Sequence, residues 1–175
     1  MLEHGTRVHD SYLQLWGGLA ASEFKQDEPA LQAWFDRVRS AMPNALLEPE
    51  GLRAYHVYHD CGKHLVLYTD ETGRRHFPDH AVASALQYAN IFPNDHRTQD
   101  LIAHDMDFHT MRGDDLRALW TQPFAATLYL TAWAEVRANA AMFGGFQSES
   151  YKIKRSRLVQ AAKKCSVLVP SLIFS

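Results

Sequence analysis

Apolar residues in the first third of the chain recur every three or four positions, which is the spacing of an amphipathic α-helix. The first such run lies between Thr6 and Trp16 and is followed by Gly17-Gly18, which we expect to end it. His9 belongs to the apolar stripe of this helix, so its ring should face the interior. The same spacing predicts a second helix from Pro29 to Met42 and a third from Pro49 to His59.

The middle of the chain holds a strand-like passage, Leu65–Tyr68, and a turn sequence, Asp70–Gly73, which together predict a small β-hairpin. Helical spacing then returns. The segment Phe124–Met142 is rich in alanine and almost uncharged, so it should be the central buried helix. The other predicted helices are His80–Asn90, Leu101–His109, Leu116–Trp120 and Tyr151–Lys164. The pattern therefore predicts an all-α fold, a compact helical bundle with one small hairpin.

The length of 175 residues favours one domain. We expect residues 1–145 to form it, and residues 146–175 to form a basic helix and an apolar tail packed on the same domain. The composition, 46% hydrophobic and 22% charged, is typical of a globular protein. No run approaches the ~18 apolar residues that cross a bilayer, so we expect no membrane partner. The absence of a signal-like start and the presence of only two cysteines predict a cytoplasmic location.

Two features of the composition bear on function. The net charge of −2 gives no general argument for binding nucleic acid, but basic residues crowd near the C-terminus, where they could contact phosphates or form a solvated helix face. Ten histidines are many for this length. They are explained either by chance enrichment at the surface or by metal chemistry, since neutral imidazole is a common metal ligand. The basic group comprises Lys152, Lys154, Arg155, Arg157, Lys163 and Lys164.

His59 and Asp60 lie side by side at the end of the third predicted helix. Adjacent helical residues point about 100° apart, so this pair can share an ion only at the helix terminus. Gly62 favours a terminus here, because glycine readily adopts the left-handed backbone that closes a helix. Other histidines and one acid occur at intervals that let further helices converge on the same point: His9, His80, His104, His109 and Glu135.

Two imidazoles and two carboxylates, those of His9, His59, Asp60 and Glu135, are the candidate ligands of a metal ion. A divalent ion held in this way acts as a Lewis acid and lowers the pKa of bound water toward ~7. His9 could instead be an ordinary core histidine, and Glu135 the buried partner of Arg137. Mn²⁺, Co²⁺, Ni²⁺ or Fe would suit the mixed ligand set, whereas Mg²⁺, also compatible, prefers oxygen ligands. One ion or two would be consistent with these residues.

The run His59-Asp60-Cys61-Gly62-Lys63 resembles the His-Asp-x-Gly-Lys signature of the HD-domain metal-dependent phosphohydrolases. The resemblance implies an all-α domain that hydrolyses phosphoester or phosphoanhydride bonds, usually in nucleotides or nucleic acids. Further similarities follow in the family's order over residues 4–140, namely the helix of His9 and the segments Phe77–Ala85, Leu101–His104 and Ala134–Arg137.

The resemblance also implies roles for individual residues. It gives a primary metal site of His9, His59, Asp60 and Glu135, and it gives a second metal or the substrate phosphate to His80, His104 and His109. The last ligand of the family is an aspartate, whereas the best match here is a glutamate. Asp114 or Asp115 therefore stays as the alternative to Glu135.

Cations near the motif are candidates for phosphate binding. Lys63 would stabilise charge on the phosphoryl group in the transition state. Its alternative role is that of a favourable cation at a helix C-terminus, worth ~0.3–1 kcal/mol. Other candidates are Arg75, Arg112, Lys152, Lys154 and Arg155. The sequence predicts no role for His4, His64, His76 and His96.

We therefore expect a hydrolase in which metal-activated water attacks the phosphorus of a nucleotide, whether a mono-, cyclic or triphosphate, with Asp60 and Lys63 as the catalytic residues. A phosphatase or nuclease acting on nucleic-acid ends is the alternative enzyme. A non-catalytic nucleic-acid- or ligand-binding protein on the same scaffold is the alternative outside catalysis, and a purely structural metal is a third interpretation. The oligomeric state is left open by the sequence.

Overall fold

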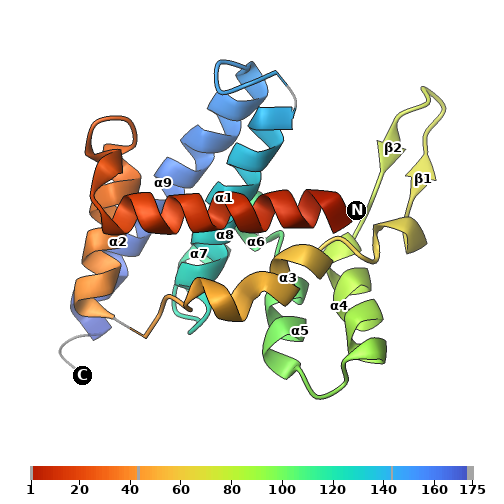
Figure 1. Cartoon of the computed structure of the whole chain (residues 1–175), viewed down its shortest axis with the longest axis horizontal. Coiled ribbons are helices and arrows are strands. Elements are labelled where there is room, and N and C mark those ends of the chain that lie inside the picture. Colours follow the sequence, from red (N-terminus) through yellow and green to blue (C-terminus); the bar gives the residue numbers. More distant parts are fainter. Residues whose placement is uncertain (1, 43, 143, 173–175) are drawn as a thin grey trace.

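The structure, a computed structural model, describes residues 2–42, 44–142 and 144–172, with side chains at 3–42, 44–142 and 144–165. Helices dominate it (Figure 1), and the predicted all-α fold with one small hairpin is confirmed. Strands β1 (Tyr68–Thr69) and β2 (Arg75–His76) form an antiparallel pair. The helices are α1 (Leu2–Ala20), α2 (Pro29–Ala41), α3 (Arg53–Tyr58), α4 (His80–Ile91), α5 (His96–Ala103), α6 (Asp107–Thr110), α7 (Gly113–Leu119), α8 (Ala125–Met142) and α9 (Glu149–Leu172), with short 3-10 turns at Glu23–Lys25, Pro49–Leu52 and Lys63–Leu65.

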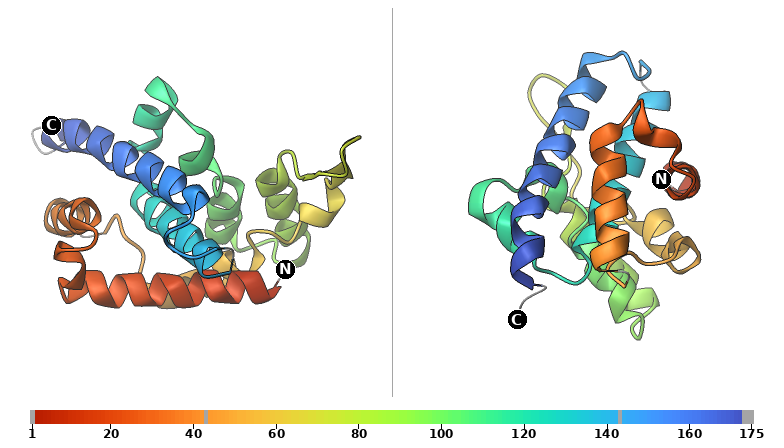
Figure 2. Two further views of the ribbon diagram at one scale, coloured as in Figure 1. Left: turned by 90° about the horizontal axis from the view of Figure 1, so that it is seen from above. Right: turned by 90° about the vertical axis from the view of Figure 1, so that its left-hand side faces the viewer.

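Helix α8 forms the centre of the bundle, as its alanine-rich sequence predicts. Its Tyr129 and Trp133 side chains have no exposed surface. Helix α1 packs against α8, and α9 packs against both α8 and α2 (Figures 1 and 2). Burying one large apolar side chain contributes about 1.5–3 kcal/mol. The apolar surface of α8 therefore fixes the direction in which its few polar side chains point.

Helix α1 is longer than the sequence predicts, because it starts at Leu2 and continues through Gly17-Gly18 to Ala20. The glycines do not end it, since Leu19 beyond them is buried in the core and outweighs their low helix propensity of about 1 kcal/mol each. Near its start, α1 lies directly on the backbone of α3. A Cβ on Gly5 would come within 2.4 Å of the carbonyl oxygen of His56. This close approach sets His4 beside the end of α3.

The end of α3 packs on α4 in a similar way, through Gly62. The prediction of a left-handed cap was wrong, because Gly62 has φ −89°, an ordinary right-handed backbone. Glycine is needed here for space: a Cβ would lie 2.4 Å from the carbonyl carbon of Ala83 and from the backbone nitrogen of Ser84. The Gly62 N–H donates a hydrogen bond to Ser84 Oγ at 2.9 Å. The His-Asp motif is thereby anchored against α4.

Two further predicted helices have different limits. The helix expected over Leu101–His109 is split, because the chain turns between the end of α5 and the start of α6. The C-terminal helix is longer than expected and packs on the bundle through buried residues that include Leu158 and Ala161. The side chains of the predicted apolar tail, beyond Cys165, lie outside the described residues.

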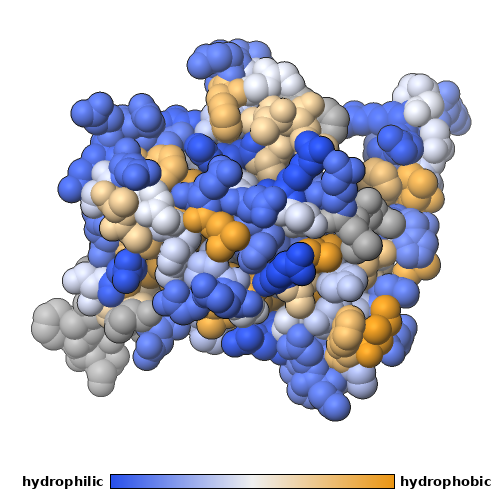
Figure 3. Space-filling model, in the orientation of Figure 1, coloured by the Kyte–Doolittle hydropathy of each residue, from blue (hydrophilic) through white to orange (hydrophobic). Residues whose placement is uncertain are grey.

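The face of the molecule in Figure 3 is mostly hydrophilic, with apolar residues scattered over it. Within the described residues, none of the helices has both the length and the apolar character needed to span a bilayer.

Candidate metal centre

The start of α1 lies beside the end of α3 (Figure 1). Here His59, Asp60 and Lys63 of the His-Asp motif line a cleft. The cleft has a volume of about 230 Å³. Helices α4, α6, α8 and α9 and the turn after α5 complete its wall. It is lined by His4, His59, Asp60, Lys63, His80, Asp105, Met106, His109, Glu135, Asn139 and Lys154.

His59 is buried, and one of its two ring nitrogens is already used. Its Nδ1–H donates to the backbone carbonyl of His56 at 2.7 Å. This bond directs Nε2 into the cleft, where it lies 3.1 Å from Glu135 Oε1 and 3.5 Å from Asp60 Oδ2. A metal-ligating histidine commonly donates its other N–H to a backbone carbonyl in this way. His59 is therefore oriented as a ligand through Nε2.

Asp60 presents one paired and one unpaired oxygen to its surroundings. Lys63 Nζ donates to Oδ2 at 2.6 Å. Oδ1 is buried and has no hydrogen-bond partner among the described residues; the cleft histidine His80 has its Nε2 3.6 Å away, too far for a hydrogen bond. Leaving a buried carboxylate oxygen unpaired is costly. A cation bound in the cleft would satisfy this atom.

Asp105, in the turn after α5, has the same arrangement. Tyr55 donates its hydroxyl to Asp105 Oδ1 at 2.6 Å, while Oδ2 is buried and finds no hydrogen-bond partner in the described part of the chain. Next to it, His109 donates from Nε2 to Glu135 Oε2 at 3.0 Å. Three buried carboxylates thus share one small space, and two of them retain an unpaired oxygen.

This crowding of carboxylates shows in the pKa values of the cleft residues. Burial alone would lower the pKa of His59, but the carboxylates of Asp105, Glu135 and Asp60 raise it to about 9. Burial and the adjacent Glu135 charge raise the pKa of Asp105. Burial would also raise the pKa of Glu135, but the hydrogen bond from His109 and the charge of His59 lower it. Excess negative charge of this kind is what a divalent cation neutralises.

The donor set fits a metal ion. Ligand atoms of His4, His59 and Asp60 lie within 4.8 Å of one another, and so do those of His59, Asp105 and Glu135. His59 belongs to both groups, so the two groups adjoin within one cleft. Nitrogen and oxygen donors together favour Mn²⁺, Co²⁺, Ni²⁺ or Fe over Mg²⁺.

The structure places His9 outside this cleft, which corrects the predicted ligand set. His9 is buried against α3, and its Nδ1 lies 3.0 Å from Nδ1 of His56. His56 in turn contacts Thr131 Oγ1 through Nε2 at 3.1 Å, and burial lowers its pKa to about 3. His4 lies in the cleft instead, because five helical residues rotate the side chain by about 140°. Gly5 is the feature of the sequence that indicates His4, because a glycine allows this end of α1 to approach α3 closely.

His104 is also outside the cleft, and its neighbour Asp105 lies inside. The His104 ring stacks on Phe124 with ring centroids 4.9 Å apart, and Nδ1 donates to Asp107 Oδ2 at 2.7 Å. The turn after α5 directs Asp105 inward and His104 outward. His80 and His109, predicted alongside His104, do line the cleft.

The predicted alternatives to Glu135 as a ligand are not near the cluster. Asp114 pairs with Arg117 at the surface, and Asp115 is exposed on α7. Of the predicted phosphate-binding cations, Lys63 and Lys154 line the cleft. The others lie elsewhere: Arg75 is in β2, Arg112 donates to the carbonyls of Met111 and His109, Lys152 pairs with Glu149, and Arg155 pairs with Glu28.

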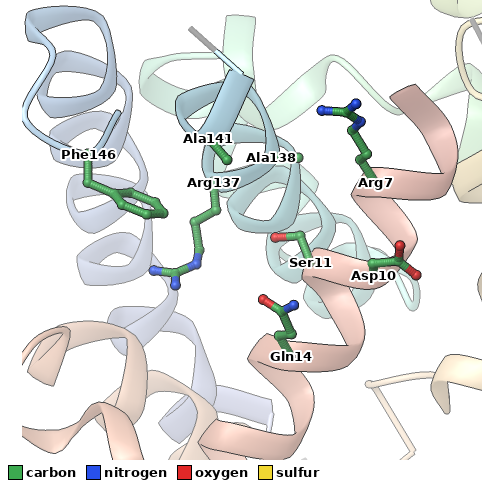
Figure 4. Close-up of a pocket in the computed structure, with 8 residues that line it drawn as sticks. All are labelled: Arg7, Asp10, Ser11, Gln14, Arg137, Ala138, Ala141 and Phe146. Atoms are coloured by element: carbon green, nitrogen blue, oxygen red, sulfur yellow. The ribbon is translucent and has the colours of Figure 1, made fainter. Parts of the chain in front are cut away.

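Another cavity lies between α1 and α8 and has a volume of about 300 Å³. Figure 4 shows the side chains that line it. Arg137 points into it, with its guanidinium carbon 5.4 Å from the ring centroid of Phe24 and 5.0 Å from that of Phe146. Arg137 and Glu135 are about 200° apart around α8, and the described residues do not show the alternative in which they pair. The described lining of this cavity includes one carboxylate, Asp10, and no histidine, so it does not form a metal-ligand set.

No protein-family model, curated protein or solved structure matches this chain. The interpretation of the cleft therefore depends on its own geometry and on the motif that supplies its residues.

Proposed function

We propose that the protein is a metal-dependent phosphohydrolase that cleaves a phosphoester or phosphoanhydride bond of a nucleotide. One observation carries the proposal: His59, Asp60, Asp105 and Glu135 converge from three parts of the chain in an open cleft, with a lysine bound to Asp60. A closed coordination shell would be expected for a purely structural metal, whereas this cluster lines a cleft.

The residues of the cleft divide into those that would hold the metal and those that would act on the substrate. His4, His59, Asp60, Asp105 and Glu135 supply the nitrogen and oxygen donors. A divalent ion held there supplies Lewis acidity and lowers the pKa of water toward ~7. The resemblance of the His59–Lys63 run to the HD-domain signature supports the same chemistry. Glu135 takes the place of that family's last aspartate.

Lys63 is placed to act on the phosphoryl group. Its side chain is 29% exposed, with Nζ bound to Asp60 Oδ2 and lying over the ring of Phe77. It therefore has donor capacity facing the cleft, where it would stabilise charge on the phosphoryl oxygens. His80 Nδ1 donates to the Phe77 carbonyl at 2.9 Å, which leaves Nε2 directed toward Asp60 and the cleft. His80 would contact the same phosphate.

The distribution of basic residues favours a nucleotide over a nucleic-acid strand. A strand needs a continuous row of free cations along its backbone. On α9, however, Lys152 is paired with Glu149 and Arg155 with Glu28. Two cations of this helix are therefore already neutralised by carboxylates, which weakens the case for a strand.

The test is hydrolysis of a panel of nucleoside mono-, cyclic and triphosphates and 5′-phosphorylated oligonucleotides, each with Mn²⁺, Co²⁺, Ni²⁺ or Mg²⁺. We expect Asp60→Asn to abolish hydrolysis with every metal. Asp115→Asn is the matched control, because this exposed aspartate lies outside the cleft, and it should retain wild-type rates. Full activity of Asp60→Asn, or no hydrolysis of any phosphate by the wild type, would contradict the proposal.

A further inference from the structure

Lys154 differs from the basic residues beside it on α9. Lys152 donates to Glu149 at 2.9 Å, and Arg155 donates from Nε to both carboxylate oxygens of the buried Glu28 at 2.7 and 2.9 Å. Lys154 is exposed and lines the cleft. Within residues 3–42, 44–142 and 144–165 it makes no hydrogen bond or ion pair, so in this part of the chain it is a free cation at the edge of the metal-ligand cluster.

A groove continues the cleft between α8 and α9. It has a volume of about 290 Å³ and shares Asn139 and Lys154 with the cleft. Asn139 lies one helical turn after Glu135 on α8, so the two side chains share a face of that helix. The groove therefore starts at the metal-ligand cluster and leads away from it. Its remaining lining residues are Val136, Ala140, Ser148, Ser150 and Tyr151.

The chemistry of the groove suits a polar group that carries hydroxyls. Asn139 offers an amide, and Ser150 a hydroxyl at an exposed position. Val136 and Ala140 supply an apolar floor between them. Cleft and groove together fall within the range of about 300–1,000 Å³ that is typical of small-molecule sites. A nucleoside is a group of this size and polarity.

We propose that Lys154, which lines the same cleft as Lys63, binds the substrate phosphate, and that the groove between α8 and α9 binds the nucleoside that leaves. This inference rests on the proposed function and adds the substrate's orientation. Carboxylates crowd the cleft and repel a phosphate, so a cation is needed on the side where the phosphate enters. Lys154 supplies it, and Asn139 directs the leaving group along α8.

The first test is binding of inorganic phosphate, measured by isothermal titration calorimetry with and without Mn²⁺. Lys154→Ala should weaken binding by about 10-fold or more, because a charge-assisted hydrogen bond is lost, and Lys154→Arg should restore much of it. Lys152→Ala is the matched control, two residues away on the same helix and paired with Glu149, and it should stay within about twofold of the wild type. Equal phosphate affinity in the Lys154→Ala and Lys152→Ala variants would overturn the inference.

The second test separates the phosphate from the leaving group. Asn139→Ala should raise KM for a nucleoside monophosphate while leaving KM for p-nitrophenyl phosphate unchanged, since the latter carries no ribose. Equal effects on both substrates would contradict the assignment of the groove. Absence of hydrolysis by the wild type would contradict the proposed function, whereas phosphate binding that is insensitive to Lys154 would contradict this inference alone.

Discussion

The close contact of α1 with α3 at Gly5 predicts how a substitution there changes the free energy of unfolding. Gly5→Ala adds a Cβ that would meet three backbone atoms of α3, the carbonyl oxygens of His56 and Val57 and the Cα of Val57, at 2.4–2.7 Å. Backbone atoms cannot rotate away as a side-chain tip can, so α1 must move. Overpacking costs about 1–3 kcal/mol, and at these distances we expect the upper end of that range. The higher helix propensity of alanine offsets about 1 kcal/mol of this cost. The free energy of unfolding should therefore fall by about 2 kcal/mol.

The same helix supplies the control. A Cβ added at Gly17 would meet no described atom within 4 Å outside its own helix, so Gly17→Ala should stabilise the protein by up to about 1 kcal/mol. Urea denaturation followed by circular dichroism measures both variants. Since displacement of α1 also moves His4, Gly5→Ala should weaken Mn²⁺ binding as well, and Gly17→Ala should not. Equal stability of the two variants would refute the argument that Gly5 is required by the close packing of α1 on α3.

Four further predictions concern the cleft and α9. The carboxylates around His59 outweigh its burial and raise its pKa to about 9. Because a metal ligand must be neutral imidazole, Mn²⁺ binding at pH 7 should release protons, and Mn²⁺ affinity should increase up to about pH 9. A Mn²⁺ affinity that does not change with pH would contradict this prediction. The protonated ring stabilises the metal-free fold below its unfolded pKa of about 6.5, so metal-free melting temperatures should fall as pH rises from there through 9. Tyr55→Phe removes the hydrogen-bond donor to Asp105 and should lower the free energy of unfolding by about 1–3 kcal/mol, measured by urea denaturation. It should also weaken Mn²⁺ binding. An unchanged free energy of unfolding together with unchanged Mn²⁺ affinity would count against a structured ligand set. Glu28→Gln weakens the ion pair with the partly exposed Arg155 and should lower the free energy of unfolding by about 1 kcal/mol in the same assay. Mn²⁺ affinity should stay unchanged. An altered Mn²⁺ affinity would mean that the packing of α9 and the metal cluster are coupled.

Periodicity was sufficient to predict the fold class and most helices, because burial of apolar stripes dominates the stability of this bundle. It predicted α8 as the central helix. The sequence also grouped His59 and Asp60 with Glu135, and the structure places these three side chains close together. The limits of α1 were missed, since Gly17-Gly18 normally indicates an end, and only the burial of Leu19 shows why the helix continues.

Hydrophobic periodicity does not determine which other histidines and acids line the cleft, because this depends on local backbone geometry. His9 and His4 both lie on α1, and which of them faces the cleft depends on the closeness of α1 to α3 at Gly5. Similarly, His104 and Asp105 are adjacent, and the turn after α5 decides which one points inward. Both outcomes follow from backbone geometry at one or two residues, which hydrophobic spacing does not resolve.

If the cluster around His59 binds a divalent metal ion, the purified protein should carry that ion. Elemental analysis of protein purified without added metal should find at least one divalent transition-metal ion per chain. Asp60→Asn and Glu135→Gln should lose that metal, while Asp115→Asn should keep it. Protein that holds no metal and shows no thermal shift with Mn²⁺, Co²⁺ or Ni²⁺ would contradict the account.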